Sequence, residues 1–234
     1  MKLLRSQIKK YSNKEKAQLY QRFFKTGKGE YGEGDVFLGL TVPQQREIVK
    51  EHKSRITIPQ IQKLLNSKIH EERMIGLLIL IEKYKKASEK DKEIFFNFYL
   101  ANTRKINNWD LVDVTSPNIV GNFLSDKKDR KILYNLAKSS NLWEKRISII
   151  STASFIRKDQ FQDTLKISEI LLKDKHDLIH KAVGWMLREV GKRNQEVEEE
   201  FLKKHHKKMP RTMLRYAIEK FPESLRKKYL KGEI

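Results

Sequence analysis

Apolar side chains recur three and four residues apart through most of the 234-residue chain. This spacing is typical of the buried face of an α-helix. Runs of alternating apolar and polar residues, which would indicate strands, are absent. Because short polar joints separate the periodic segments, the pattern predicts an all-α array of antiparallel helices. The clearest predicted helices cover residues 58–67, 71–86, 88–102 and 209–221.

The ends of these segments carry signals that suit helix termini. Two acidic residues open the 71–86 segment and two lysines close it, in agreement with the helix macrodipole. Ser88 is a candidate N-cap for the next helix. Pro210 lies near the start of the 209–221 segment, where proline is tolerated.

A basic or aromatic position recurs at nearly constant intervals along the chain. The gaps between its members are 36, 37, 35 and 30 residues. A period of this length, built from two helices, is typical of HEAT-like repeats. It predicts a curved solenoid of antiparallel helix pairs, forming a single domain over residues 1–234. The recurring residues are Arg73, Trp109, Arg146, Lys181 and Arg211.

A second row of positions follows four residues after the first. Residues at i and i+4 share a helix face, so stacked repeats would bring the two rows side by side on one surface. Aromatic, acidic and basic side chains in these rows do not suit a face made only for packing. We therefore expect Trp109 and Asp113 to share a surface with Arg146 and Trp185. The second row consists of Leu77, Asp113, Ile150, Trp185 and Arg215.

The net charge of the chain gives information about its binding partner. The chain carries a formal charge of +20, and residues 201–234 alone contain 8 Lys and 3 Arg against 3 Glu. Such a surplus indicates a polyanionic partner, of which nucleic acid is the leading candidate. A merely soluble basic surface is the alternative. An anionic membrane fits less well, because no segment joins this charge to a broad exposed aromatic face.

Several other classes are disfavoured. The chain has no cysteine, hence no disulfide framework and no thiolate metal site. No apolar run approaches the roughly 18 residues of a membrane span, and no apolar leader segment follows Met1. We expect a soluble cytoplasmic protein.

Two further motifs are weak. The stretch GKGEYG, residues 27–32, matches a dinucleotide-binding fingerprint letter for letter, but a predicted helix and not a strand precedes it. We interpret it as a flexible connector. His176 and His180 stand four residues apart without an evident third ligand, so we expect neither a metal nor a cofactor. Trp143 suits packing between repeats as well as it suits a site.

Four stretches together resemble bacterial DNA alkylation repair glycosylases of the AlkD type. The resemblance extends from about residue 14 to about residue 221. The motifs are short individually, and their order and spacing make the similarity specific. They are FLGLTVPQQREIVK (37–50), NWDLVD (108–113), NLWEKRISII (141–150) and IHKAVGWMLRE (179–189).

The resemblance implies a curved HEAT-like array whose concave basic face holds duplex DNA and removes positively charged N3- and N7-alkylated purines. It implies that Asp113 is the catalytic carboxylate, with Trp109 and Trp185 as aromatic walls and Arg146 beside them. It also implies that the lesion is held by its sugar and backbone, without a deep pocket for an extruded base. Arg146, Lys181, Arg211 and Arg215 are the candidate phosphate contacts, and we expect a monomer.

The chemistry of such lesions explains these residue types. A cationic purine leaves as a neutral base, so no general acid is needed. Positive charge develops on the sugar, where a carboxylate can stabilise it and orient water. Indole faces attract cations, with about 0.5 to 2 kcal/mol for each contact. The family also has an early aromatic residue near the DNA, and here either Phe23 or Phe24 could take that place.

Two alternatives belong to other classes. A HEAT-like module could bind bent or damaged DNA without catalysis, which burial of Asp113 or of Trp185 in the core would favour. A scaffold for acidic proteins is the third interpretation, and the aligned Trp and Asp residues argue against it.

Overall fold

The chain forms helices joined by loops, most of them short; the loop over residues 24–41 between two helices is long. The structure, a computed structural model, describes residues 1–234 and contains no β-strand. One isolated bridge joins Val36 to Ile69. The predicted all-α class is therefore confirmed. The helices divide into two compact units, Met1–Thr115 and Ser116–Ile234, and the single domain over 1–234 stays a prediction.

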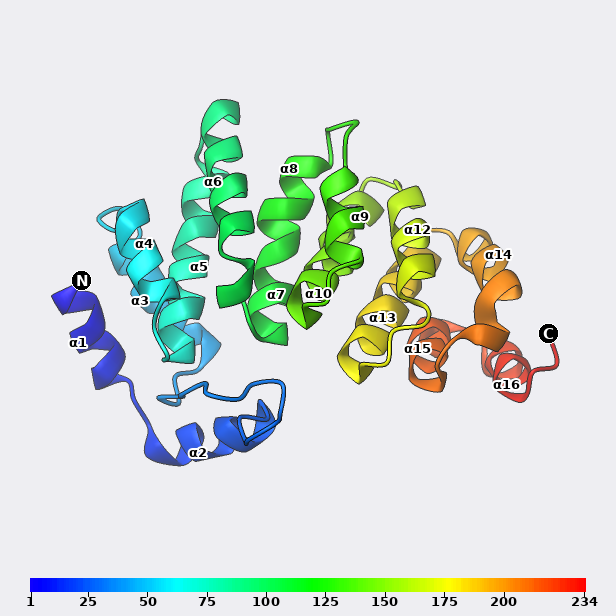
Figure 1. The fold of residues 1–234 in the computed structure, drawn as a ribbon, viewed down its shortest axis with the longest axis horizontal. Coiled ribbons are helices and arrows are strands. Elements are labelled where there is room, and N and C mark those ends of the chain that lie inside the picture. Colours follow the sequence, from blue (N-terminus) through cyan, green and yellow to red (C-terminus); the bar gives the residue numbers. More distant parts are fainter. The chain divides into compact units, whose positions relative to one another are not determined.

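Unit 1 is a set of packed helices around α5. Figure 1 shows α3, α4, α5 and α6 as neighbouring coils, and α5 packs against each of the other three. α1 packs in turn on α3. The helices of unit 1 are α1 (Lys2–Lys10), α2 (Lys14–Phe23), α3 (Val42–His52), α4 (Ile58–Leu65), α5 (His70–Lys85), α6 (Glu89–Ala101), the 3₁₀ turn η1 (Thr103–Lys105) and α7 (Trp109–Ser116).

The central helix α5 is buried nearly all round. Its middle is a continuous apolar run, and even the four residues of its first turn, residues 70–73, are buried. A helix of this kind belongs to the interior of a protein. Polar side chains at its start must therefore find partners inside the unit.

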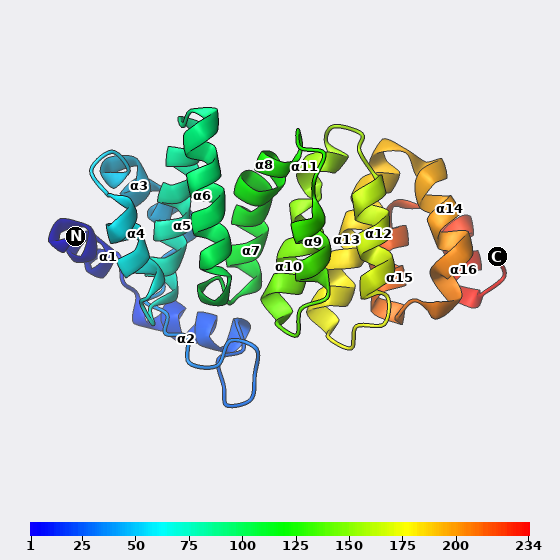
Figure 2. The same ribbon diagram turned by 45° about the horizontal axis from the view of Figure 1, so that its top comes forward.

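Unit 2 is organised around α13. Figure 2 shows α13, α12 and α15 in that order across the view, and α13 packs against α10, α12, α14 and α15. The elements of unit 2 are the π-helical turn η2 (Pro117–Gly121), α8 (Asn122–Leu124), α9 (Lys131–Ala137), α10 (Leu142–Ser151), α11 (Ala153–Ile156), α12 (Gln162–Leu171), α13 (Asp177–Arg193), α14 (Gln195–His205), η3 (His206–Lys208), α15 (Arg211–Ala217), η4 (Ile218–Lys220) and α16 (Glu223–Lys231).

The predicted helix ends are mostly confirmed. The hydroxyl of Ser88 accepts a hydrogen bond from the backbone N–H of Asp91 at 3.2 Å and caps α6. Pro210 is the N-cap of α15. The helix predicted over 209–221 is shorter, because its last turn tightens into η4. Phe221 precedes Pro222 and is extended (φ −69°, ψ 151°), as the proline ring requires of its neighbour.

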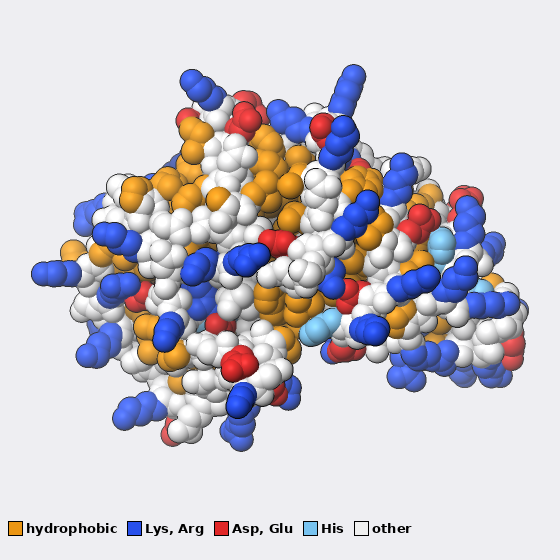
Figure 3. Space-filling view, in the orientation of Figure 1, with side chains coloured by type: hydrophobic (Ala, Val, Ile, Leu, Met, Phe, Trp, Pro, Cys, Tyr) orange, Lys and Arg blue, Asp and Glu red, His pale blue; other side chains and the backbone are white.

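Basic side chains cover the end of unit 2. In Figure 3, Lys and Arg side chains gather over α14, α15 and α16, in agreement with the charge of residues 201–234. No helix in the structure has both the length and the apolar character needed to cross a bilayer.

Gly184 allows α13 and α15 to approach closely. A Cβ atom at this position would lie 2.4 Å from the carbonyl oxygen of Met213 and 2.5 Å from Cβ of Tyr216. We expect Gly184→Ala to lower the free energy of unfolding by about 1 to 3 kcal/mol, because the helices must move apart. Urea denaturation would measure this loss. Gly27→Ala is the matched control, since the nearest atoms belong only to the flexible side chain of Glu30, and an unchanged Gly184→Ala variant would contradict the close approach.

Candidate functional site

The helix α7 presents Trp109 and Asp113 on one face. Leu111, Val112 and Thr115 are buried, whereas Trp109 and Asp113 are half-buried. The two groups lie one helical turn apart, as their i, i+4 spacing requires. Asp113 is thus neither a core residue nor a freely solvated one, and the burial that would favour a non-catalytic module is not observed.

The buried face of α7 is fixed by a hydrogen-bonded pair. The hydroxyls of Tyr99 and Thr115 lie 2.8 Å apart, and the Thr115 hydroxyl also donates to the carbonyl oxygen of Leu111. Burial raises the pKa of Tyr99, and the negative charge of Asp113 raises it further. The phenol therefore stays neutral and keeps its hydrogen bond to the helix.

Trp109 belongs to a stack of aromatic rings within unit 1. Its ring stacks on Phe24 at a centroid distance of 5.2 Å. Phe24 stacks in turn on Phe37 at 4.8 Å, and Phe37 on His70 at 4.4 Å. We call Trp109, Phe24, Phe37 and His70 the aromatic stack. Contacts of this kind add about 0.5 to 1.5 kcal/mol beyond area burial, so they restrict the orientation of the indole.

Phe23 and Phe24, the two candidates for the early aromatic residue near the DNA, differ in exposure. Phe24 is 9% exposed and forms part of the aromatic stack, whereas Phe23 is 60% exposed. The Phe23 ring meets Trp109 edge-on at 5.8 Å. Phe23 is therefore the early aromatic residue that is available to a ligand beside Trp109.

A buried charge network lies at the start of α7, and the sequence analysis missed it. The two ring nitrogens of His70 lie 3.2 Å from Asp35 and 2.8 Å from Asp110. Asp35 also pairs with Arg73 at 2.7 Å. We call these four residues the His70 clamp. Its members are up to 75 residues apart in sequence; the one local signal was an acidic residue directly after Trp109.

Electrostatics within the clamp favour the charged forms. Burial alone would lower the pKa of His70, but the carboxylates of Asp110 and Asp35 raise it to about 9. Burial would likewise raise the pKa of Asp35, and its hydrogen bond to His70 and the charge of Arg73 bring it below its usual value. At neutral pH His70 is therefore protonated and Asp35 is ionised.

The glycine-rich segment 26–36 is held by its own hydrogen bonds. The backbone N–H of Gly27 donates to the carboxylate of Glu30, and that of Gly29 donates to Glu33. The segment ends at Asp35, inside the clamp. The donors that a phosphate would use at Gly27 and Gly29 are thus already occupied by carboxylates of the same segment. The flexible connector stays a prediction.

A cavity of about 330 Å³ lies beside the aromatic stack. Its walls include Phe23, Phe24, Phe37, His70 and Asp110, and neither Trp109 nor Asp113 lines it. The cavity is thus separate from the face that carries the candidate carboxylate.

In unit 2, Lys181 and Trp185 lie one turn apart on α13. Trp185 is half-buried, and its indole N–H donates to Glu189 at 3.1 Å. Lys181 is also half-buried and pairs with Asp177 at 2.6 Å. Trp185 is therefore not turned into the core. These positions leave both residues accessible in part to a ligand of unit 2.

Arg146 is more enclosed than a phosphate contact requires. It is 5% exposed, and its guanidinium donates to the carbonyl oxygen of Leu178. This contact joins α10 to the start of α13 and favours a structural role. Binding of phosphate by Arg146 stays a prediction.

Several members of the two aligned rows are buried within their own units. Arg73 is 3% exposed and turns inward to Asp35, while Leu77 and Ile150 are core residues. The prediction of a continuous surface is wrong at these positions, because the repeats are too irregular for equal sequence spacing to give equal exposure. Only in the last pair, Arg211 and Arg215 on α15, are both residues exposed.

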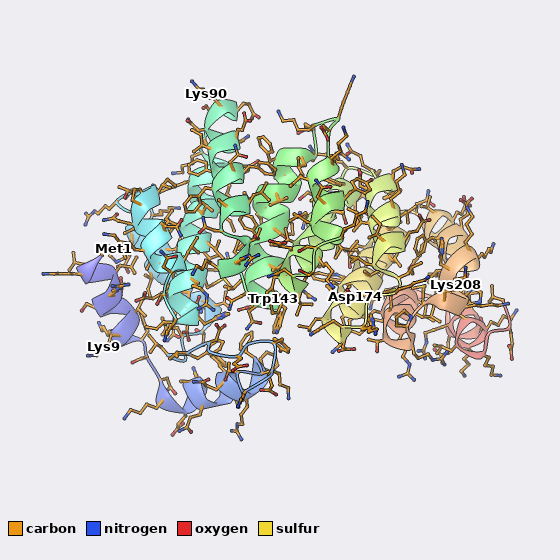
Figure 4. All side chains as sticks on the ribbon, viewed as in Figure 1. Met1, Lys9, Lys90, Trp143, Asp174 and Lys208 are labelled. Atoms are coloured by element: carbon orange, nitrogen blue, oxygen red, sulfur yellow. The ribbon has the colours of Figure 1, made fainter.

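The remaining weak motifs have structural roles. Trp143 lies near the start of α10 and is buried in unit 2 (Figure 4). Nδ1 of His176 accepts from the backbone N–H of Leu178 and caps α13. The ring of His180 contacts the carbonyl oxygen of Asp174, in the turn before that helix.

Packed helix pairs without a sheet define an all-α helical-repeat protein. A family model described as "DNA alkylation repair enzyme" matches residues 4–221, and the chain belongs to that family. Membership supports a role in DNA repair, with DNA as the partner.

The fold is shared with a solved structure described as "Predicted DNA alkylation repair enzyme from Enterococcus faecalis". The TM-score is 0.69 at 16% sequence identity, and the similarity covers 91% of this chain and 97% of the other. No curated protein matches the chain.

Proposed function

We propose that the protein is a DNA glycosylase that removes cationic N3- and N7-alkylated purines from duplex DNA. Asp113 is the electrostatic catalyst, and Trp109 binds the sugar and backbone at the lesion. The observation that carries this proposal is the placement of Asp113 and Trp109 on one half-exposed face of α7. Membership in the DNA alkylation repair family supports it.

Asp113 suits a reaction in which the leaving group needs no proton. The alkylated base departs as a neutral molecule, and positive charge appears on the sugar. A carboxylate that is partly withdrawn from water stabilises this charge more strongly than a solvated one. The same carboxylate can orient the attacking water, and no metal or cofactor enters the reaction.

Trp109 suits the neighbouring task of holding a cation. Its ring is fixed by Phe24 in the aromatic stack, so little side-chain freedom is lost when a ligand binds. An indole face attracts both the cationic purine and the oxocarbenium. The exposed ring of Phe23 extends this surface at the edge of Trp109.

The proposed roles in unit 2 follow from the resemblance and from exposure. Trp185 is the second aromatic contact. Lys181, Arg211 and Arg215 bind phosphates, which gives affinity without sequence preference. The net charge of +20 adds long-range attraction to the duplex.

The direct test is single-turnover release of 7-methylguanine from a duplex oligonucleotide. We expect release by the wild-type protein in excess over DNA, and none from the same duplex without the lesion. Binding should weaken steeply with salt, because phosphate contacts release counterions. Tight, salt-sensitive binding without release of 7-methylguanine or 3-methyladenine would overturn the glycosylase and favour a DNA-binding module. Binding to an acidic protein that excess DNA does not displace would favour a scaffold for acidic proteins.

A further inference from the structure

The His70 clamp connects three parts of unit 1 at the point where α7 begins. Asp35 comes from the glycine-rich segment, His70 and Arg73 from α5, and Asp110 from the first turn of α7. His70 and Asp35 are almost completely buried, and 16% of the Asp110 side chain is exposed. The amide of Asn107 adds a further donor to Asp35 at 3.3 Å.

The geometry defines the protonation state of the imidazole. Each ring nitrogen faces a carboxylate oxygen, and a carboxylate can only accept. A neutral imidazole has one N–H, so one of the two contacts would then join two acceptors. Both contacts are satisfied only when His70 is an imidazolium.

Two routes lead from His70 to the proposed site. The first is the hydrogen bond to Asp110, whose own backbone neighbours Trp109 in α7. The second is the aromatic stack, in which His70 lies against Phe37 and Trp109 against Phe24. A cation against an aromatic face strengthens the first contact of this stack. Both routes end at the residues that the proposed reaction uses.

We propose that the His70 imidazolium is a positioning residue for the glycosylase: held between Asp35 and Asp110, it sets the start of α7 and thereby the placement of Trp109 and Asp113. This inference rests on the proposed function. His70 contacts neither of the two acting side chains in its hydrogen bonds, and it acts through Asp110 and through the stack.

Deprotonation of the His70 imidazolium weakens the contacts that hold the clamp together. A neutral His70 leaves one of Asp35 and Asp110 without a donor from the ring. Asp35 retains Arg73 and Asn107, whereas Asp110 has no other cation in the clamp. The neutral ring can still donate one N–H to Asp110, but the positive charge that strengthens this hydrogen bond is lost. The first turn of α7 is then held less firmly. A displacement near 1 Å at a reacting group can cost about a hundredfold in rate.

The charged groups that face the imidazole set the direction of the pH effect. They are Asp35, Asp110 and Arg73, and Glu71 lies next along α5, where it is bound to backbone N–H groups. The pKa of His70 is raised from 6.5 to about 9. The clamp is therefore complete below the ordinary pKa of histidine and is lost as the pH rises through about 9.

The first test reads the position of Trp109 without any reaction. The protein is labelled with 5-fluorotryptophan, and the ¹⁹F signal of Trp109 is assigned with Trp109→Phe. We expect this signal to shift with pH with a midpoint of about 9 in the wild type and to lose that midpoint in His70→Gln. His52→Gln is the matched control, because His52 lies in the same unit and its side chain hydrogen-bonds to Gln7, outside the clamp.

The second test measures the single-turnover rate of base release. We expect His70→Gln to lower the single-turnover rate at pH 7 by roughly 10- to 100-fold, with little change in DNA affinity. The ratio of wild-type to variant rates should fall towards one as the pH rises through about 9. Any titration of the substrate itself cancels in this ratio. A purely structural histidine would lower thermal stability and leave the ratio independent of pH.

The outcomes separate this inference from the function on which it rests. A Trp109 signal without a transition between pH 8 and 10 overturns the clamp, whether or not the protein excises bases. Equal rates for wild type and His70→Gln at pH 7 also overturn it. If the wild type releases no base while the Trp109 signal titrates as expected, the proposed glycosylase is wrong and the clamp holds only as a structural device.

Discussion

Asp113→Asn is expected to lower the single-turnover release of 7-methylguanine at least a hundredfold. The amide keeps the shape of the side chain and removes its negative charge. A preorganised electrostatic contact of this kind contributes about 3 to 4 kcal/mol to the transition state, or roughly a hundred- to thousandfold in rate. Affinity for the duplex should hold or rise slightly, because the variant carries one negative charge less. Fluorescence anisotropy with the same oligonucleotide measures that affinity.

Asp91→Asn is the matched control for this prediction. Asp91 is an exposed carboxylate in the first turn of α6 and belongs to the same unit. The same chemical change there should leave the release rate within a factor of about two, since surface substitutions away from a site have small effects. If Asp113→Asn releases 7-methylguanine at the wild-type rate, the carboxylate of Asp113 takes no part in catalysis. A parallel loss of rate and of affinity would instead indicate that Asp113 maintains the binding surface.

The helical architecture could be predicted because its signals are local. The apolar periodicity of residues 58–65 and the cap at Ser88 depend only on neighbours within a turn or two, and both agree with the structure. Repetition of such segments with short joints was enough to indicate the all-α class. The same reasoning overestimated the helix at 209–221, where Pro222 imposes an extended residue at its end.

The roles of charged residues could not be predicted in the same way. The sequence placed Arg73 on a ligand-facing row, yet its guanidinium is buried against Asp35. It assigned Glu71 to the helix macrodipole, yet that carboxylate binds backbone groups more than 30 residues away. Both outcomes depend on which segment covers the start of α5. A buried charge is stable only with such partners, and no local pattern reveals them.

The candidate site could be predicted only in part, because some of its features are local and others depend on tertiary packing. The i, i+4 spacing of Trp109 and Asp113 places them on one face of any helix, and this was correct. The choice between Phe23 and Phe24 was open because adjacent residues differ by about 100° around the helix. Only the tertiary packing of Phe24 on Trp109 and Phe37 makes Phe24 buried and leaves Phe23 exposed. The roles of these residues in catalysis stay predictions.

Glu71→Ala is expected to cause the largest loss of stability among these variants. Its buried carboxylate accepts hydrogen bonds from the backbone N–H groups of Leu38, Gly39 and Leu40, at 2.8 to 3.2 Å. Truncation leaves these donors without acceptors inside unit 1, where each orphaned group costs about 1 to 3 kcal/mol. We expect the free energy of unfolding to fall by about 3 to 4 kcal/mol in urea denaturation, since the costs are not fully additive.

Glu71→Gln separates the charge of this residue from its role as an acceptor. The amide oxygen can still accept from part of the segment, so we expect an intermediate loss of about 1 to 2 kcal/mol. Glu93→Ala removes an exposed carboxylate on α6 and should change the free energy of unfolding by less than about 0.5 kcal/mol. Equal stabilities of Glu71→Ala and Glu93→Ala would show that Leu38, Gly39 and Leu40 find other acceptors, and that Glu71 does not hold the segment that leads from Asp35 in the clamp to α3.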